Sequence, residues 1–392
     1  MKKGFSKIML SIGAIALLFY LECMDSGYKN TVLEQIGISL YESGLLASKM
    51  EQGPVFLRLA MGNQFFFSTA RSEKLAKKSL IYRENQSGTQ GTGEQLAEAE
   101  NEAQLYSSGD ASAVAGENLA QVQAMGGSGT AAYVNKLRES KDVNYLWNHF
   151  YIIDSTTSVK KNLFPVEEML KRNMTLKQKP GKKQILIYHT HGASEAFADS
   201  QKGKESDSIV GVGTELAKEL EKNGYGVYHD KTKYDQINGT IDRSKAYNES
   251  LEGIGRAMAQ NPDIQVTIDL HRDSVGKNKQ TFTMIDGKRT AIVMFFNGMS
   301  RSKSGPIDYL HNPNLEANLS FSLQLKCHAM ETYEGFTKPI YLKGYRYNLH
   351  MAERALLVEL GNENNTVEEA KNAAAPLAKV IADVLKGEVN GF

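Results

Sequence analysis

The stretch Ile185-Leu186-Ile187-Tyr188-His189-Thr190-His191-Gly192-Ala193-Ser194-Glu195 joins a short apolar run to two histidines and a glutamate. A short apolar run of this kind is predicted to be a strand. His189 and His191 are two residues apart, and on an extended chain such residues point to the same face, so both can approach one ion. The stretch therefore predicts a strand that ends in a group able to bind metal.

Strand-like and helix-like patterns alternate after this stretch. Further apolar runs predict strands at residues 226–228, 266–270, 291–296 and 356–360. Helical periodicity lies between them, at residues 208–222, 241–259, 313–331 and 367–385. The alternation predicts an α/β fold, a three-layer αβα sandwich with a largely parallel sheet. In such sheets functional residues collect at the carboxyl ends of the strands.

Two more predicted strands carry ionisable residues near their ends. One continues into Asp269-Leu270-His271-Arg272-Asp273, and the last contains Val358-Glu359-Leu360-Gly361. Two histidines and a carboxylate can hold zinc while leaving one position open for water. A separate carboxylate can then act as general base on that water. The pattern indicates a metal-dependent hydrolase.

Each of these residues also has a purely structural interpretation. A single histidine at a strand end is more often hydrogen-bonded within the fold than bound to metal, but two such ends beside a glutamate favour metal. Glu359 in an apolar strand could be a buried carboxylate with a structural partner, because an unpaired one is costly. His350 fits the wall of a substrate cleft and a surface loop equally well.

Composition and motifs exclude several classes of protein. The 46 basic and 45 acidic residues leave a net charge of +1, so no charge excess points to nucleic acid as a partner. The only cysteines are Cys23 and Cys327, which excludes a disulfide-dense scaffold and a cysteine-based zinc cluster. The sequence has no His-Glu-x-x-His, P-loop or Gly-x-Ser-x-Gly motif, which removes the zincin, NTPase and serine-hydrolase classes.

The N-terminus carries a membrane-targeting pattern. Three lysines precede an apolar run over residues 8–21, which ends at Glu22. No small-x-small cleavage site follows the run, so residues 1–26 are interpreted as an uncleaved anchor that crosses the membrane once. A cleaved signal peptide and a buried core helix are the alternatives. With an anchor or a signal peptide, the rest of the chain is expected outside the cytoplasm.

The remaining chain divides by composition. Residues 27–83 have helical spacing and are interpreted as a membrane-proximal helical region. Residues 84–135 hold seven acidic residues and no Lys, Arg, Phe, Ile or Pro, which predicts a flexible acidic linker of low complexity. Residues 136–183 are expected to be a lead-in that packs on a catalytic domain at residues 184–392.

Several stretches, in a fixed order, resemble the stage II sporulation protein P family of endospore-forming Firmicutes. They are Phe150-Tyr151-Ile152-Ile153-Asp154-Ser155-Thr156-Thr157, residues 185–195, Asp269-Leu270-His271-Arg272-Asp273, Arg346-Tyr347-Asn348 and Val358-Glu359-Leu360-Gly361. The anchor and the linker also suit that family.

This resemblance implies a membrane-anchored peptidoglycan hydrolase with the fold of the zinc-dependent N-acetylmuramoyl-L-alanine amidase superfamily. The implied reaction cleaves the amide between N-acetylmuramic acid and L-alanine of the stem peptide, with endopeptidase action on cross-links as a possible addition. The implied setting is engulfment during endospore formation, between the mother cell and forespore membranes. The implied partners are stage II sporulation protein D, a lytic transglycosylase, and stage II sporulation protein M.

The resemblance also implies a ligand set for Zn2+, namely His191, His271 and Glu195. The first zinc histidine of the superfamily lies just past the first strand, which favours His191 over the alternate His189. The second superfamily ligand is a glutamate that opens the next helix, a place that Glu205 holds. Glu195 is preferred because it follows the histidine pair at a spacing that the family favours.

Glu359 matches the catalytic glutamate on the final strand of the superfamily. Other residues are expected to orient a ligand, to stabilise the developing oxyanion or to contact substrate. This supporting set comprises His189, Arg272, Asp273, Arg346 and His350.

Two rival functions are compatible with the same pattern. A non-catalytic wall-binding protein with a decayed site would have lost at least one ligand, whereas all the candidate ligands are present here. A carboxypeptidase-type metallohydrolase would release different fragments from the wall.

Overall fold

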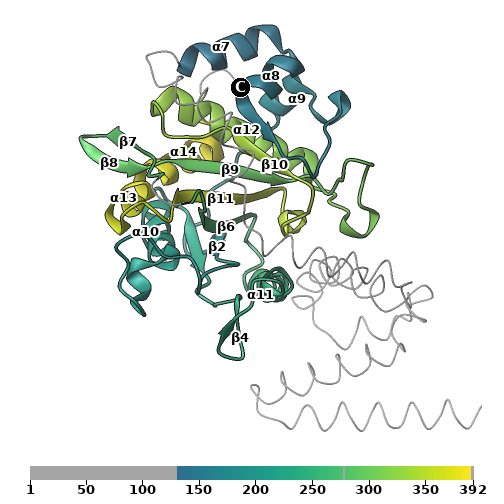
Figure 1. The fold of residues 1–392 in the computed structure, drawn as a ribbon. Coiled ribbons are helices and arrows are strands. Elements are labelled where there is room, and N and C mark those ends of the chain that lie inside the picture. Colours follow the sequence, from purple (N-terminus) through teal and green to yellow (C-terminus); the bar gives the residue numbers. More distant parts are fainter. Residues whose placement is uncertain (1–129, 277–278, 390–392) are drawn as a thin grey trace, which may run out of the picture. The chain divides into compact units, whose positions relative to one another are not determined.

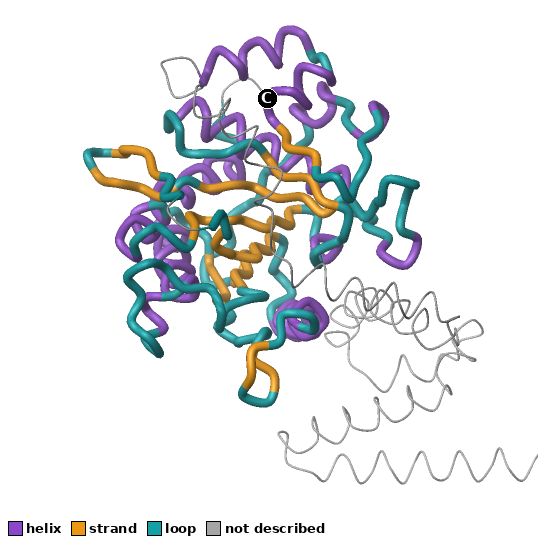
Figure 2. The backbone as a smooth tube through the Cα atoms, viewed as in Figure 1, coloured by secondary structure: helices purple, strands orange, loops and turns teal. Residues whose placement is uncertain are grey.

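A computed structural model describes residues 130–276 and 279–389 of the chain. Its centre is a seven-stranded sheet, shown as arrows in Figure 1 and in orange in Figure 2. In spatial order the strands are β1 (Tyr151–Ile153), β10 (Ile340–Lys343), β9 (Val293–Gly298), β11 (Arg354–Asn362), β6 (Val266–Asp273), β2 (Lys183–Tyr188) and β3 (Gly226–His229).

The sheet is mixed but mostly parallel. Each neighbouring pair of strands runs parallel except β9 and β11, which are antiparallel. Strands β11, β6, β2 and β3 therefore point one way, and β9, β10 and β1 point the other way. The expectation of an α/β fold with a largely parallel sheet is confirmed.

Helices flank this sheet, and two small hairpins extend from it. The α-helices are α7 (Thr130–Ser140), α8 (Val143–Phe150), α9 (Val166–Lys171), α10 (Ile209–Lys222), α11 (Ala246–Gln260), α12 (Leu315–Thr332), α13 (Val367–Asn372) and α14 (Ala374–Lys386). Short 3-10 helices are η2 (Lys161–Leu163), η3 (Glu205–Asp207), η4 (Asp308–Leu310) and η5 (Leu349–Met351). The hairpins pair β4 (Gln236–Ile237) with β5 (Thr240–Ile241) and β7 (Phe282–Ile285) with β8 (Lys288–Ala291).

Both faces of the sheet are covered by apolar packing. Alternate residues of a strand point to opposite faces. Ile185 and Ile187 of β2 belong to the main core with side chains of α10, α12 and α14. Leu186 and Tyr188 pack on the opposite face against Ile254 and neighbouring side chains of α11. The fold therefore has helices on both sides of the sheet (Figure 1).

The helix expected over residues 367–385 is interrupted, and α14 begins after a break at Ala373. Pro376 explains the break, because proline has no N–H for the helical hydrogen bond to residue 372 and crowds the preceding turn. The first segment, α13, begins with a capping box in which Thr366 and Glu369 bond each other's backbone N–H.

The lead-in at residues 136–183 does not only pack on the domain but also supplies a strand of the central sheet. Its strand β1 pairs with β10 and forms one edge of the seven-stranded sheet. Its first helix, α7, begins at Thr130, inside the range 84–135 expected to be linker, and its side chains Val134 and Leu137 are buried. The apolar spacing of these two residues gives α7 a buried face, and this helix extends back into the end of that range.

Several expectations lie outside the described residues: the anchor at 1–26, the helical region at 27–83 and the linker up to residue 129. Within residues 130–276 and 279–389, no helix has the length and hydropathy needed to span a bilayer.

Candidate active site

Three adjacent strands bring the candidate residues to one edge of the sheet. Strands β11, β6 and β2 are neighbours and parallel, so their carboxyl ends lie together. Glu359 on β11 is in register with His271 on β6. The segment after β2 carries His191 and Glu195 to the same edge, where Glu195 contacts His271. The sheet thus joins residues that are far apart in the sequence.

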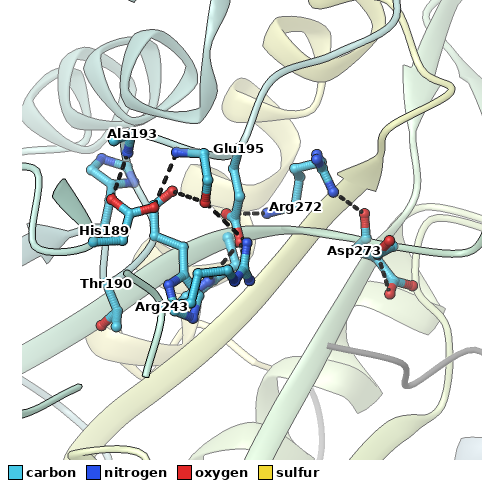
Figure 3. Close-up of polar contacts among 12 residues, drawn as sticks. His189, Thr190, Ala193, Glu195, Arg243, Arg272 and Asp273 are labelled. Carbon is cyan, nitrogen blue, oxygen red and sulfur yellow. Dashed lines mark hydrogen bonds and ion pairs between the residues drawn. The ribbon is translucent and has the colours of Figure 1, made fainter. Parts of the chain in front are cut away.

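Glu195 is buried and held by three groups. Its Oε1 lies 3.2 Å from Nδ1 of His271 and 3.5 Å from Nη2 of Arg243. Its Oε2 accepts the backbone N–H of Arg272 at 3.0 Å. Figure 3 shows this carboxylate between the two arginines. Burial alone would raise the pKa of Glu195, but the charge and hydrogen bond of His271, with charges of His191 and Arg243, lower it to about 2.

His271 lies between two carboxylates. Its Nδ1 faces Glu195, and its Nε2 lies 2.8 Å from Oδ1 of Asp269. Burial opposes a charge on this ring, but the two carboxylates outweigh burial and raise its pKa well above the usual range. His271 is therefore oriented by Asp269 on one side and Glu195 on the other.

His191 is buried beside these groups. Its ring centre lies 5.2 Å from that of His271 and 5.6 Å from that of Tyr247, both edge to face. Its Nδ1 is buried and has no hydrogen-bond partner in the described part of the chain. Burial, then the charges of His271 and Arg243, lowers its pKa well below the usual value, so the ring is neutral, as a metal ligand must be.

Glu359 lies at the same edge of the sheet, and one oxygen of its carboxyl group makes no hydrogen bond to the described residues. Its Oε2 is buried without a hydrogen-bond partner among the described residues. Burial raises the pKa of Glu359 to about 8, with the negative charges of Asp273 and Glu195 acting in the same direction. Asp273 is itself paired with Lys338, whose Nζ lies 2.8 Å from Oδ2.

His189 points elsewhere. Its Nδ1 lies 2.8 Å from the carbonyl oxygen of Leu270, and its Nε2 lies 2.9 Å from Nε2 of His229 at the end of β3. Burial lowers the pKa of His189 to about 4 and that of His229 to about 3. Gly213 of α10 makes room for this pair, since a Cβ there would lie 2.6 Å from the His189 ring.

The other candidates occupy different surroundings. Glu205 is exposed in η3, and its carboxylate lies 3.6 Å from Nζ of Lys231. Arg272 donates from its guanidinium to the carbonyls of Ala196 and Asp273, so it braces the segment that carries Glu195. The structure therefore brings Glu195 to His271 and places Glu205 in a surface ion pair.

Arg346 and His350 are both buried near the loop that leads into η5. Arg346 donates to the carbonyl of His311 at 3.3 Å, and the carbonyl of His350 accepts the side-chain amide of Asn314 at 2.7 Å. Burial and the contact with Asn314 place His350 inside the fold, so it does not lie on a surface loop.

Three further residues of this site were not predicted from the sequence. Asp269 is fully buried beside His271, and Arg243 binds both Ser194 and Glu195. Asp235 accepts the backbone N–H groups of Ala193 and Ser194 at 2.9 and 3.0 Å. Asp269 could have been found, since it stands two residues before His271 on the same face of an apolar strand. Arg243 and Asp235 lie in a polar segment with no such signal.

The donor set at this edge fits a zinc ion in its chemistry. Imidazole nitrogen and carboxylate oxygen are zinc ligands, with bonds of about 2.0–2.2 Å in tetrahedral geometry. Two such ligand atoms lie about 3.3–3.5 Å apart, by the same bond lengths. The observed 3.2 Å between Glu195 Oε1 and His271 Nδ1 is close to this separation. His191 adds a buried nitrogen with no partner among the described residues.

The arrangement is nevertheless not a closed metal cage. Within residues 130–276 and 279–389, no three His, Cys, Asp or Glu side chains are grouped as ligands around one point.

The fold and this edge define an α/β protein with a buried histidine and carboxylate cluster at the ends of parallel strands. Residues 64–382 match the family described as Stage II sporulation protein P (SpoIIP), and the chain belongs to that family. Stage II sporulation protein P of Bacillus subtilis (strain 168) is 31% identical over 218 residues. That match covers 52% of this chain and 51% of the relative, so the chain spans about half the length of the curated relative.

Solved structures of amidases were also matched. The amidase AmiC2 of Nostoc punctiforme is 12% identical with a TM-score of 0.31, and covers 54% of this chain and 98% of its own. CwlV of Bacillus (Paenibacillus) polymyxa is 15% identical with a TM-score of 0.33, covering 53% and 97%. Because these TM-scores are low, the fold assignment rests on the sheet of this chain and the family on its sequence.

Proposed function

We propose that this protein is a zinc-dependent peptidoglycan hydrolase that acts during endospore formation. The proposed reaction cleaves the amide between N-acetylmuramic acid and L-alanine of the stem peptide. The observation that carries the proposal is the meeting of His191, His271 and Glu195 at one sheet edge, with Glu359 in register beside them. Family membership supports the sporulation role.

His191, His271 and Glu195 would hold the zinc ion. Bound zinc supplies a Lewis acid and lowers the pKa of a water toward neutrality. Glu195 suits a ligand because its low pKa keeps it charged, and because Arg243 and the backbone N–H of Arg272 fix its carboxylate.

Glu359 is the proposed proton-transfer group. Its carboxylate accepts a proton from the attacking water and then returns that proton to the leaving amine. A pKa near 8, raised by burial, places Glu359 close to the operating pH, where one group can both accept and donate. Lys338 neutralises Asp273 and so limits the negative charge around Glu359.

The resemblance extends the proposal to the setting of the reaction. We infer a single-pass anchor at residues 1–26, with the catalytic domain outside the cytoplasm between the mother cell and forespore membranes. The inferred partners are peptidoglycan and the stage II sporulation proteins D and M. Endopeptidase action on cross-links is a further property that the family implies.

The first test measures zinc and cleavage together. The purified full chain is expected to contain close to one zinc per molecule by elemental analysis. Glu359→Gln should keep the zinc and lose cleavage of purified cell wall by at least about 100-fold, since general acid–base catalysis contributes about 10²–10⁴-fold. Glu353→Gln, exposed just before the same strand begins, is the matched control and should cleave normally.

The released fragments identify the bond. An amidase leaves new N-terminal L-alanine on free stem peptides and glycan strands without peptides, which mass spectrometry separates from peptides cut at cross-links. Near-full activity of Glu359→Gln would remove Glu359 from the mechanism. Wild-type chain that cleaves the wall without bound metal would overturn the zinc part of the proposal.

A further inference from the structure

The loop that follows strand β9 carries a buried arginine whose charge is not paired. Arg301 is 7% exposed, and its Nε is buried. In the part of the chain that the structure describes, its guanidinium makes no hydrogen bond and no ion pair. Burial of an unpaired charge is costly, so buried charged groups are normally paired with an opposite charge. Arg301 therefore lacks an anion that the described residues do not supply.

The residue before Arg301 also has a polar group without a partner. Ser300 is 7% exposed, and its Oγ is buried with no hydrogen-bond partner among residues 130–276 and 279–389. Its backbone is left-handed, with a φ of 50°, which is uncommon for a residue other than glycine. Few buried polar groups in a native fold lack a partner, and each calls for an ordered water or an ion. A water can satisfy the hydroxyl, but it cannot neutralise the charge of Arg301.

A second buried cation lies beside this loop. Lys343 ends strand β10, is in register with Gly298 of β9 and is 9% exposed. Among the described residues, its ammonium makes no hydrogen bond. The backbone N–H of Arg301 donates to the carbonyl of Gly344 at 2.8 Å, so Arg301 and Lys343 come from adjacent backbone segments.

The carboxylate of Asp154, after the neighbouring strand β1, is occupied by neutral donors. Its Oδ1 accepts the backbone N–H of Thr156 at 2.8 Å and the hydroxyl of Thr156 at 2.6 Å. Its Oδ2 accepts the hydroxyl of Tyr341. No ion pair joins Asp154 to Lys343 or Arg301 within the described ranges. This carboxylate therefore does not take the place of the missing anion.

The sequence around the two cations adds no negative charge. Residues 298–307 and 340–352 together hold four Lys or Arg and no Asp or Glu. The acidic residues that follow these two segments, Asp308 and Glu353, are exposed to solvent. Since charges interact more strongly in a buried site than in water, the buried cations favour an anion here.

Hydroxyl groups from the segment after β1 hold the loop in place. Thr157 donates to the carbonyl of Arg301 at 2.7 Å, and Ser158 donates to the carbonyl of Ser302 at 2.9 Å. Both contacts use the backbone of the loop and leave the side chain of Arg301 uncommitted. A loop fixed in this way has its donors in position before a ligand arrives, which lowers the cost of binding.

We propose that Arg301, Lys343 and Ser300 form a binding site for an oxyanion, a group with terminal oxygens such as a carboxylate or a phosphate. A guanidinium matches two such oxygens with its planar set of N–H groups, an ammonium adds a second positive charge, and a hydroxyl donates one more hydrogen bond. Two sources offer this chemistry, the carboxylates of wall stem peptides and free phosphate. The site does not involve zinc and goes beyond the proposed function.

Phosphate binding by the full chain tests the site directly. The probe is inorganic phosphate, measured by isothermal titration calorimetry with sodium chloride keeping the ionic strength constant. Arg301→Met removes the charge and keeps an unbranched side chain. It should weaken phosphate binding at least about tenfold, as loss of a hydrogen bond to a charged group does. Phosphate that binds Arg301→Met as tightly as the wild type would lie elsewhere, and that result would overturn the proposal.

Arg354→Met is the matched control. It removes the same charge, but the guanidinium of Arg354 already donates to the carbonyls of Met174 and Thr175. Its phosphate binding should equal that of the wild type. Without phosphate, Arg354→Met should lower the Tm because two carbonyls lose their donor, whereas Arg301→Met should not, because it removes an unpaired charge. An equal loss of Tm in both variants would mean that Arg301 has an internal partner, against the proposal.

Arg301→Lys is the second variant, for the case that Arg301→Met does not fold. It keeps the charge and most of the stem but lacks the planar pair of N–H groups. It should fold and should bind phosphate more weakly than the wild type. Unchanged phosphate affinity in Arg301→Lys would contradict the role given to the guanidinium.

Retention on the wall distinguishes the two sources of the anion. The full chain is sedimented with purified peptidoglycan in the cold, with and without inorganic phosphate. If wall carboxylates fill the site, Arg301→Met is retained less than Arg354→Met, and phosphate releases the wild type. If phosphate alone fills it, both variants are retained alike.

The outcomes also separate this inference from the proposed function. A chain in which neither phosphate binding nor wall retention depends on Arg301 would overturn the oxyanion site and leave the hydrolase proposal unchanged. A chain that binds phosphate through Arg301 but contains no zinc would overturn the zinc proposal and support the oxyanion site.

Discussion

At the scale of single residues, Glu195 and Glu359 show how surroundings divide the roles of two carboxylates. Both lie close to His271, yet the pKa of Glu195 is about 2 and that of Glu359 is about 8. Glu195 accepts three contacts from nitrogen, whereas Oε2 of Glu359 is buried with no partner among the described residues. A pair with separated pKa values can supply one charged ligand and one proton carrier.

The sequence could predict much of this residue set. His191, Glu195 and His271 each follow or end an apolar run, and parallel strands collect their ends at one edge. It could not predict Arg243, which reaches Glu195 from a polar segment between β3 and α11. Contacts of that kind depend on the path of a loop, which neither periodicity nor spacing records.

The buried side chain of Lys326 allows a test of how burial of a charge changes the free energy of unfolding with pH. Its ammonium is buried in α12 and donates to the carbonyl and hydroxyl of Thr337, both at 2.8 Å. Burial lowers its pKa from 10.5 to about 7. Between about pH 7 and 10 the unfolded chain therefore holds more protons at this residue, so the free energy of unfolding rises with pH. The full shift corresponds to at most about 5 kcal/mol.

We expect Lys326→Met to remove this rise. The free energy of unfolding of the variant, measured by denaturant titration, should gain several kcal/mol less than the wild type between pH 7 and pH 10. The unpaired carbonyl of Thr337 costs the variant about 1–3 kcal/mol at every pH, so the comparison is of slopes. Lys218→Met, exposed on α10, should keep the wild-type slope, and the same slope in Lys326→Met would contradict the argument.

At the scale of elements, the long central strands could be predicted from the sequence, whereas the short strands at one side of the sheet could not. Strands β2, β6 and β11 are buried on both faces, so they appear in the sequence as apolar runs. Strands β1 and β10 have three and four residues and are defined by pairing with each other across most of the domain. Likewise α11 begins at Ala246, later than its apolar pattern suggests, because Ile241 belongs to β5.

At Gly213, helix α10 lies so close to His189 and His229 that a larger side chain is predicted to destabilise the protein. A methyl group there would lie 2.6 Å from the ring of His189 and 2.9 Å from Nε2 of His229. Gly213→Ala should therefore destabilise the protein by about 1–3 kcal/mol through overpacking, despite the better helix propensity of alanine. Thermal unfolding of the full chain measures the change.

Gly255 of α11 is the matched control for this prediction. It has open space where a Cβ would be placed, so Gly255→Ala should stabilise the protein by about 0.5–1 kcal/mol. Equal shifts in both variants would show that the helix, and not the histidine pair, determines the effect at Gly213.

At the scale of the whole molecule, the main hydrophobic core of the described residues crosses the expected boundary at residue 184. Helices α7 and α9 pack on α12, and Gln324 of α12 donates to the carbonyls of Met169, Leu170 and Arg172. Twelve apolar side chains between residues 130 and 183 are buried. The lead-in is thus part of the same hydrophobic core as the strands that carry the site.

A chain that begins at residue 184 is therefore expected not to fold. Burial of a large apolar side chain contributes about 1.5–3 kcal/mol, so losing twelve exceeds the about 5–15 kcal/mol by which a domain is stable. The cut also removes β1 and exposes the edge of β10 to other chains. Residues 130–392 should show a cooperative thermal transition, and residues 184–392 should aggregate or show none. A cooperative transition of the shorter chain at the same temperature would mean that residues 184–392 fold without the lead-in.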